Sequence, residues 1–208
     1  PNLGSTPSGV VATDVNTVTT APTASTYTVV STLSSNTYAV GVGGDFATLT
    51  DAVTAYNNSC LDGPVIFSLT DLLYNESVTI LNNADASAVN SLFIQPVNPG
   101  TVISGNAATG TIRMSGARFV IVDGSPDGLG GYVSGDNMVV RNTLGTAPAI
   151  QLINETNNCT VRWADLQSNN SGATATANAG VVNIGTTAGN NGNDNNTIAD
   201  CDIHNITG

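Results

Sequence analysis

The sequence predicts an all-β protein, a right-handed parallel β-helix with a capping helix near its N-terminus. A short-strand unit recurs in the second half of the chain, with loops of varying length between its copies. Such repeats are typical of solenoids, because one unit cannot bury its own apolar face but stacked units can. Only 9% of residues are charged, and Gly, Asn, Thr, Ser and Ala take their place, which suits short strands and tight turns.

The repeat is clearest between residues 158–168 and 195–205. The two copies align as follows: Asn158 with Asn195, Thr160 with Thr197, Val161 with Ile198, Asp165 with Asp202 and Leu166 with Ile203. An apolar strand precedes each copy, and an earlier copy covers 111–125. We therefore expect 111–124, 149–166 and 181–204 to form successive coils, with Val161 stacked on Ile198 and with an amide ladder between Asn158 and Asn195.

One helix is expected at about residues 47–57. Apolar residues follow helical spacing from Phe46 onward: Phe46, Leu49, Ala52, Val53 and Tyr56. Thr48 or Thr50 can cap its start. We expect this helix to cover the open N-terminal end of the solenoid and to shield exposed strand edges.

The chain divides into two parts by composition. Residues 1–26 are rich in Thr, Ser, Ala and Pro, which predicts a leader or linker. Residues 27–208 form the predicted β-helix domain. The strand pattern is still repeating where the sequence stops, so we expect a solenoid truncated at its C-terminus, a fragment of a longer protein.

Charge and cysteine content narrow the function. The net charge is -11, with four basic residues, all of them arginine. Binding to nucleic acid needs basic clusters, so this class is excluded, and anionic membrane surfaces are disfavoured for the same reason. No apolar run has membrane-spanning length. The three cysteines, Cys60, Cys159 and Cys201, are expected to be small buried residues, with a Cys159–Cys201 disulfide as the alternative.

Several segments carry a family resemblance: YAVGVGGDFATLTDAVTAYN at 38–57, GPVIFSLTD at 63–71, YNESVTI at 74–80, RFVIVDGS at 118–125 and NNTIADCDI at 195–203. Together they resemble large exported proteins of Bacteroidetes that have pectin-lyase-like parallel β-helices and are often carried by the type IX secretion route. The resemblance implies this fold and a place outside the cell, secreted or on the cell surface. It implies no activity, because the fold hosts lyases, hydrolases, adhesins and structural fibres.

The weak catalytic candidates are Asp165 and Asp202, which occupy equivalent repeat positions. Stacked carboxylates could bind Ca²⁺ or act as the acid/base pair of a glycosidase. The alternative, which we favour, is that each Asp caps a turn through a backbone N–H, as Asp123 could in the earlier copy. His204 is the one histidine, either a ligand-binding residue or an ordinary outward-facing side chain.

Two further residues are candidate binding sites. Trp163 could stack on sugars or pack inside the protein. Asp194 lies in the Asn- and Gly-rich segment 189–196, which could hold Ca²⁺ or serve as a connecting loop. No other cofactor is expected.

The leading functional hypothesis is a structural or adhesive module of a bacterial secreted or cell-surface protein. Its expected partners are carbohydrate, other surface components, or further units of a fibre. The alternative is a fragment of a carbohydrate-active enzyme, a polysaccharide lyase or glycoside hydrolase. A third hypothesis is ice binding, suggested by the Thr-rich segment 172–177, although no regular ladder of threonines runs across the coils.

Overall fold

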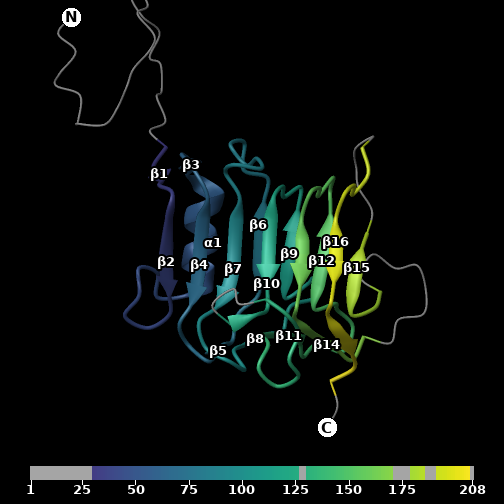
Figure 1. The fold of residues 1–208 in the computed structure, drawn as a ribbon. Coiled ribbons are helices and arrows are strands. Elements are labelled where there is room, and N and C mark those ends of the chain that lie inside the picture. The colour runs from purple at the N-terminus through teal and green to yellow at the C-terminus, as the bar shows by residue number, and fades with distance from the viewer. Residues whose placement is uncertain (1–29, 127–129, 171–178, 186–190, 207–208) are drawn as a thin grey trace, which may run out of the picture.

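The computed structural model describes residues 30–126, 130–170, 179–185 and 191–206 as a stack of short strands (Figure 1). The predicted linker at 1–26 and the Thr-rich segment 172–177 lie outside the described residues.

Most strands belong to three parallel sheets. The first sheet contains β2 (Asn36–Val40), β4 (Val65–Leu69), β7 (Leu92–Pro96), β10 (Val120–Asp123), β13 (Thr160–Arg162) and β16 (Thr197–Ala199). The second contains β5 (Leu73–Tyr74), β8 (Val102–Gly105), β11 (Val139–Asn142), β14 (Asp165–Ser168) and β17 (Asp202–His204). The third contains β6 (Val78–Leu81), β9 (Ile112–Ser115), β12 (Ile150–Ile153) and β15 (Val182–Ile184). A separate pair joins β1 (Thr32–Leu33) to β3 (Cys60–Leu61).

The chain visits the first, second and third sheets in turn, and each strand pairs with its equivalent one coil further on. All of these pairings are parallel, and Val161 of β13 lies in register with Ile198 of β16. The predicted segments 111–124, 149–166 and 181–204 supply neighbouring strands of the same sheets. The predicted all-β parallel solenoid is therefore confirmed, and an antiparallel sandwich is excluded.

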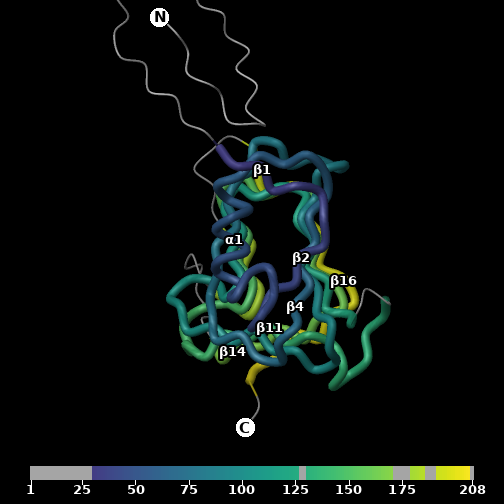
Figure 2. Tube along the Cα trace, turned by 90° about the vertical axis from the view of Figure 1, so that its left-hand side faces the viewer, coloured from purple at the N-terminus to yellow at the C-terminus, as the bar shows by residue number. Residues whose placement is uncertain are grey.

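The core fills the space that the three sheets enclose. Within each strand alternate side chains point inward, as Val161 and Leu166 do, and both are fully buried. Figure 2 looks along the stack and shows α1 (Leu49–Asn58) and β2 on opposite sides of this interior. At the N-terminal end the rings of Tyr38, Phe46 and Phe67 pack against one another, with centroids 5.5–6.5 Å apart.

The predicted helix forms, and Thr48 caps it by accepting a hydrogen bond from the Asp51 N–H at 3.0 Å. It lies beside β6, the edge strand at the N-terminal end of the third sheet, and takes the place of a further strand there. The Asn57 amide donates to the Thr79 carbonyl and accepts from the Leu81 N–H, each at 2.9 Å. These are the backbone groups of β6 that a further strand would pair with, so the helix does shield an edge.

The predicted hydrogen bond between the side-chain amides of Asn158 and Asn195 does not form. Both residues adopt the left-handed backbone conformation, with φ of 54°, which asparagine tolerates. The Asn158 amide, however, donates to its neighbour Asn157. Asn196 makes the contact between coils instead, because it accepts from the Cys159 N–H and donates to the Thr156 carbonyl.

All three cysteines are free. Strand register places Cys159 in the column of Asn196 and Cys201 in the column of Ala164, so the alternative disulfide does not form. Burial raises the pKa of the Cys159 thiol to about 11, as expected for a buried structural cysteine. Cys60 is exposed, and its predicted burial is wrong because β3 pairs with β1, outside the three walls.

Within the described part of the chain, no helix is both long and apolar enough to cross a membrane.

Replacing Leu49 by Asp should lower the free energy of unfolding by several kcal/mol, because Leu49 is fully buried and the new charge would lack a partner. The matched control is Thr54→Asp at an exposed position of the same helix, where a change within about 0.5 kcal/mol is expected. Chemical denaturation followed by circular dichroism measures both. Equal effects of the two substitutions would show that α1 is peripheral to the core.

Candidate functional site

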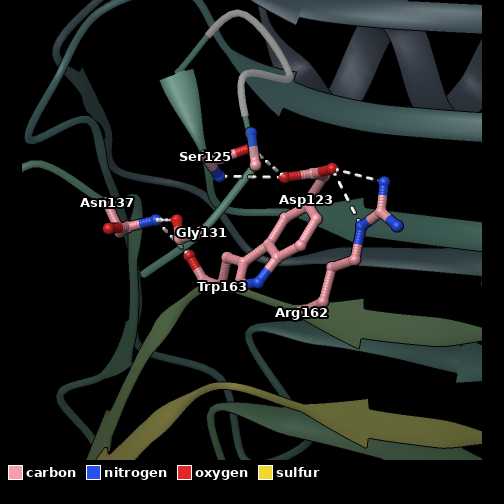
Figure 3. Close-up of polar contacts among 7 residues, drawn as sticks. Asp123, Ser125, Gly131, Asn137, Arg162 and Trp163 are labelled. Carbon is pink, nitrogen blue, oxygen red and sulfur yellow. Dashed lines mark hydrogen bonds and ion pairs between the residues drawn. The ribbon is translucent and has the colours of Figure 1, made fainter. Parts of the chain in front are cut away.

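The inserted segment 124–138 connects β10 of the first sheet to β11 of the second, and its described residues, 124–126 and 130–138, lie at the corner between them. Two clusters form beside it. The corner cluster contains Asp123, Ser125, Asn137, Arg162 and Trp163 (Figure 3). The outer cluster contains Tyr132, Asp165, Gln167, Asp202 and His204. Strand register thus gathers most of the sequence-predicted site residues along one edge of the solenoid.

A buried ion pair is the centre of the corner cluster. Asp123 is only 1% exposed. One of its carboxylate oxygens accepts from Arg162, from Nε at 3.0 Å and Nη2 at 2.8 Å. The other accepts from the Ser125 N–H at 2.9 Å and from its hydroxyl at 2.6 Å. Both oxygens are therefore satisfied, and Asp123 anchors the start of the inserted segment.

Trp163 takes part in the same anchoring. The Arg162 guanidinium carbon lies 4.3 Å from the centroid of the ring, a cation–π contact. Gly130 approaches the far edge of the ring, where a Cβ would lie 3.3 Å from Cη2. The Trp163 carbonyl accepts from the Asn137 amide at 2.7 Å. Arg162 and Gly130 thus cover part of the half-buried Trp163 ring. Its role in stacking on sugars stays a prediction.

The outer cluster joins β14, β17 and the inserted segment. Asp165 and Asp202 are in register on neighbouring strands. His204 Nε2 lies 3.0 Å from Asp165 Oδ1 and 3.9 Å from Asp202 Oδ2. Gln167 donates to Asp165 at 2.8 Å, and the Tyr132 hydroxyl donates to Asp202 at 3.4 Å. In the described structure both carboxylates contact side chains and no backbone N–H group. The expected turn-capping role is therefore wrong for Asp165 and Asp202. Asp123 does cap a turn, because it accepts from the Ser125 N–H.

The environment of His204 favours the imidazolium form. The hydrogen bond between Nδ1 and the Asn205 carbonyl, at 2.6 Å, is the largest influence that raises the pKa of His204. The negative charges of Asp165 and Asp202 raise it further, while partial burial works against them. Nδ1 bonds to the Asn205 carbonyl, while Nε2 lies at ion-pair distance from both carboxylates, and nearby negative charges favour the protonated ring.

The same two carboxylates affect the pKa of Tyr132. Burial first, and then the carboxylates of Asp165 and Asp202, raise the pKa of the Tyr132 phenol. The phenol is therefore a hydrogen-bond donor to Asp202 at neutral pH, and it ties the inserted segment to the last described coil.

The calcium candidate Asp194 is exposed, and its backbone carbonyl accepts from the Asn158 N–H at 3.2 Å. Residues 189–190 of the predicted segment lie outside the described residues. In the described ranges, no group of three or more His, Cys, Asp or Glu side chains could hold a metal ion.

Two hollows of the described surface differ in their position relative to these clusters. One, of about 370 Å³, opens between the end of α1 and β3, with Asn57, Cys60 and Asp85 in its lining. The other, of about 280 Å³, lies under the inserted segment, with Pro99, Ser125 and Asn137 in its lining. Neither is lined by Asp165 or Asp202.

Sequence reasoning missed the Asp123–Arg162 pair and the role of Tyr132. The first could have been found, because continuing the repeat alignment back to 118–125 places Asp123 opposite Arg162, as the strand register does. Tyr132 comes from an insertion with no counterpart in the other coils, so nothing in the repeat indicates its position.

No protein-family model, curated protein or solved structure matches this chain.

Replacing Arg162 by Ala should lower the free energy of unfolding by roughly 1–3 kcal/mol, because it leaves part of a buried carboxylate without its charged donor. The control is Arg118→Ala, which removes an equal charge from an exposed arginine for which the structure shows no ion pair. Thermal and chemical denaturation of the two variants provide the measurement. If they prove equally stable, Asp123 does not depend on Arg162.

Gly124→Ala should disturb this corner strongly, because a Cβ there would lie 2.1 Å from the Trp163 carbonyl oxygen and 2.7 Å from Ala164 Cα. Both are backbone atoms and cannot rotate away, so we expect a loss of at least about 2 kcal/mol or failure to fold. Gly145→Ala is the control, since a Cβ there meets nothing within 4 Å. A Gly124→Ala protein as stable as the control would mean that the strands at this corner can separate freely.

Proposed function

We propose that this chain is a structural or adhesive module of a bacterial protein that works outside the cell, secreted or on the cell surface. The observation that carries the proposal is the unbroken register of three parallel sheets through the described coils. Each coil of such a stack contacts only its neighbours, which makes an extended, rigid scaffold suited to spacing or presenting a surface. The net charge of -11 fits a protein in an extracellular medium of high ionic strength, where salt screens the repulsion between its own charges.

We also propose that the parallel solenoid is a right-handed parallel β-helix of the kind found in pectin-lyase-like exported proteins. Crossovers between parallel strands of one sheet are right-handed in about 98% of cases, and every coil here makes such a crossover. The sequence resemblance supports this assignment. An experimental structure that shows left-handed coils would contradict it.

The outer faces support a scaffold or contact surface more than a catalytic centre. The strong polar groups are engaged with one another, Asp123 with Arg162 and Asp165 with His204. Hydrolysis of a glycosidic bond needs a carboxylic acid and a second carboxylate on either side of a bound sugar. Neither of the two hollows described above is lined by Asp165 or Asp202.

A carbohydrate-active enzyme remains the second candidate because Asp165 and Asp202 share the outer face of neighbouring strands. Strand spacing of about 4.8 Å is close to the separation of about 5–5.5 Å between the carboxyl groups of a retaining glycosidase. Ice binding is less favoured. The outward row of the first sheet begins and ends with threonine, but Ile66, Phe93 and Ile121 interrupt it.

The test is a screen of the 208-residue chain for reducing sugars and unsaturated products on pectins, alginates and plant or algal glucans, with calcium present. Retention on the same polysaccharides in insoluble form is measured in parallel. We expect no turnover, because Asp165 and Asp202 contact side chains of the protein and line neither of the two hollows described above. Retention without turnover would support an adhesive module. If the chain shows neither retention nor turnover, a structural module is supported.

Turnover that Asp165→Asn or Asp202→Asn abolishes would overturn the proposal in favour of the enzyme. Asp200→Asn is the matched control in that experiment, since it removes one exposed carboxylate from the corner before β17 while leaving the outer cluster intact.

A further inference from the structure

The outer cluster is placed where it can hold the last described coil. Within the described residues β17 pairs through its backbone with β14 on one side only. Asp202 and His204 add side-chain contacts to this backbone pairing. His204 Nε2 lies 3.0 Å from Asp165 Oδ1 of β14, and Asp202 accepts from the Tyr132 hydroxyl at 3.4 Å. These contacts join β17 to β14 and to the inserted segment.

We propose that His204 is a proton-operated clasp that fastens β17 to β14 and to the inserted segment. In the imidazolium form the ring donates from Nδ1 to the Asn205 carbonyl, and its Nε2 lies at ion-pair distance, 3.0 Å, from Asp165 Oδ1 of β14. Its positive charge also lies between Asp165 and Asp202, which strand register forces onto one face. When the ring loses its proton, its positive charge disappears and two carboxylates on neighbouring strands are left facing each other.

The groups that face His204 come from three elements. On β14 these are Asp165 and the uncharged Gln167, which is in register with His204. On β17 the facing group is Asp202, and on the inserted segment it is Tyr132, which donates to Asp202. Arg141 of β11 is in register with Gln167 and so lies one strand beyond it. The charged groups at these positions are therefore acidic, and Arg141 lies on the far side of β14.

The direction of the pH effect follows from this arrangement. The surroundings raise the pKa of His204 above 6.5, its ordinary value. A group whose pKa is higher in the folded than in the open state stabilises the folded form most below the open-state value, and this stabilisation is lost as pH rises through the folded value. The clasp is thus fully closed below about pH 6.5, and its contribution is lost as pH rises through the higher folded-state pKa of His204. Release of one proton can change the closed-to-open ratio by at most about tenfold per pH unit.

The first experiment titrates His204 by proton NMR in the full chain, where the one histidine gives an unambiguous ring signal. We expect a midpoint above 6.5 in the parent protein and a fall of at least about 0.5 unit in Asp165→Asn. The control Asp200→Asn removes the same charge outside the cluster and should shift the midpoint by less than about 0.2 unit. A parent midpoint at or below 6.5, or equal shifts in the two variants, would overturn the proposal.

The second experiment measures hydrogen-exchange protection factors for the amides of β17 between pH 6 and pH 8.5. In the parent protein they should fall as pH rises, whereas the amides of β4 in the core should keep theirs. In His204→Gln the β17 protection should be low and independent of pH, because glutamine cannot gain the charge. Identical pH profiles for the parent and His204→Gln would show that the ring is not the clasp, whatever the chain's function outside the cell.

Discussion

Register between parallel strands is the constraint on which the rest of this structure depends. Each strand pairs with its equivalent one coil away, and a slip of one residue would turn every inward side chain outward. Val161 and Ile198 therefore share a column in the core. The same rule sets Asp165 directly beside Asp202, where like charges on neighbouring strands repel. His204 lies on the same face, with Nε2 3.0 Å from Asp165 and 3.9 Å from Asp202, so a core constraint creates the polar cluster outside.

Parallel pairing also leaves an unpaired edge at the N-terminal end of each sheet, and α1 covers that of the third. A helix cannot pair with a strand through its backbone, because its own N–H and C=O groups bond within the helix. Side chains make the connection instead. Asn57 supplies one donor and one acceptor to β6, while Glu76, just before β6, accepts from the Leu49 and Thr50 N–H groups at the start of the helix. Two polar side chains thus join a helix to a sheet.

The corner between the first two sheets tolerates an insertion because coil loops face outward and contact few other coils. The insertion nonetheless buries Asp123, and a buried carboxylate requires a charged partner. Arg162 of the next coil provides it, and the Arg162 guanidinium in turn covers Trp163. Gly124 is needed at this corner because the next coil passes too close for any side chain. Polar satisfaction and close backbone packing together fix the segment that later reaches the outer cluster through Tyr132.

By itself the sequence determined the parallel solenoid, the helix and the pairing of Val161 with Ile198, because these follow from apolar periodicity and from repeats along the chain. It also placed Asp165 and Asp202 at equivalent positions. Only the tertiary structure decided what these residues touch. The exposure of Cys60, the place of α1 beside β6 and the meeting of Tyr132 with Asp202 depend on how loops of unequal length fold back over the coils. Periodicity carries no information about such loops, since they do not repeat.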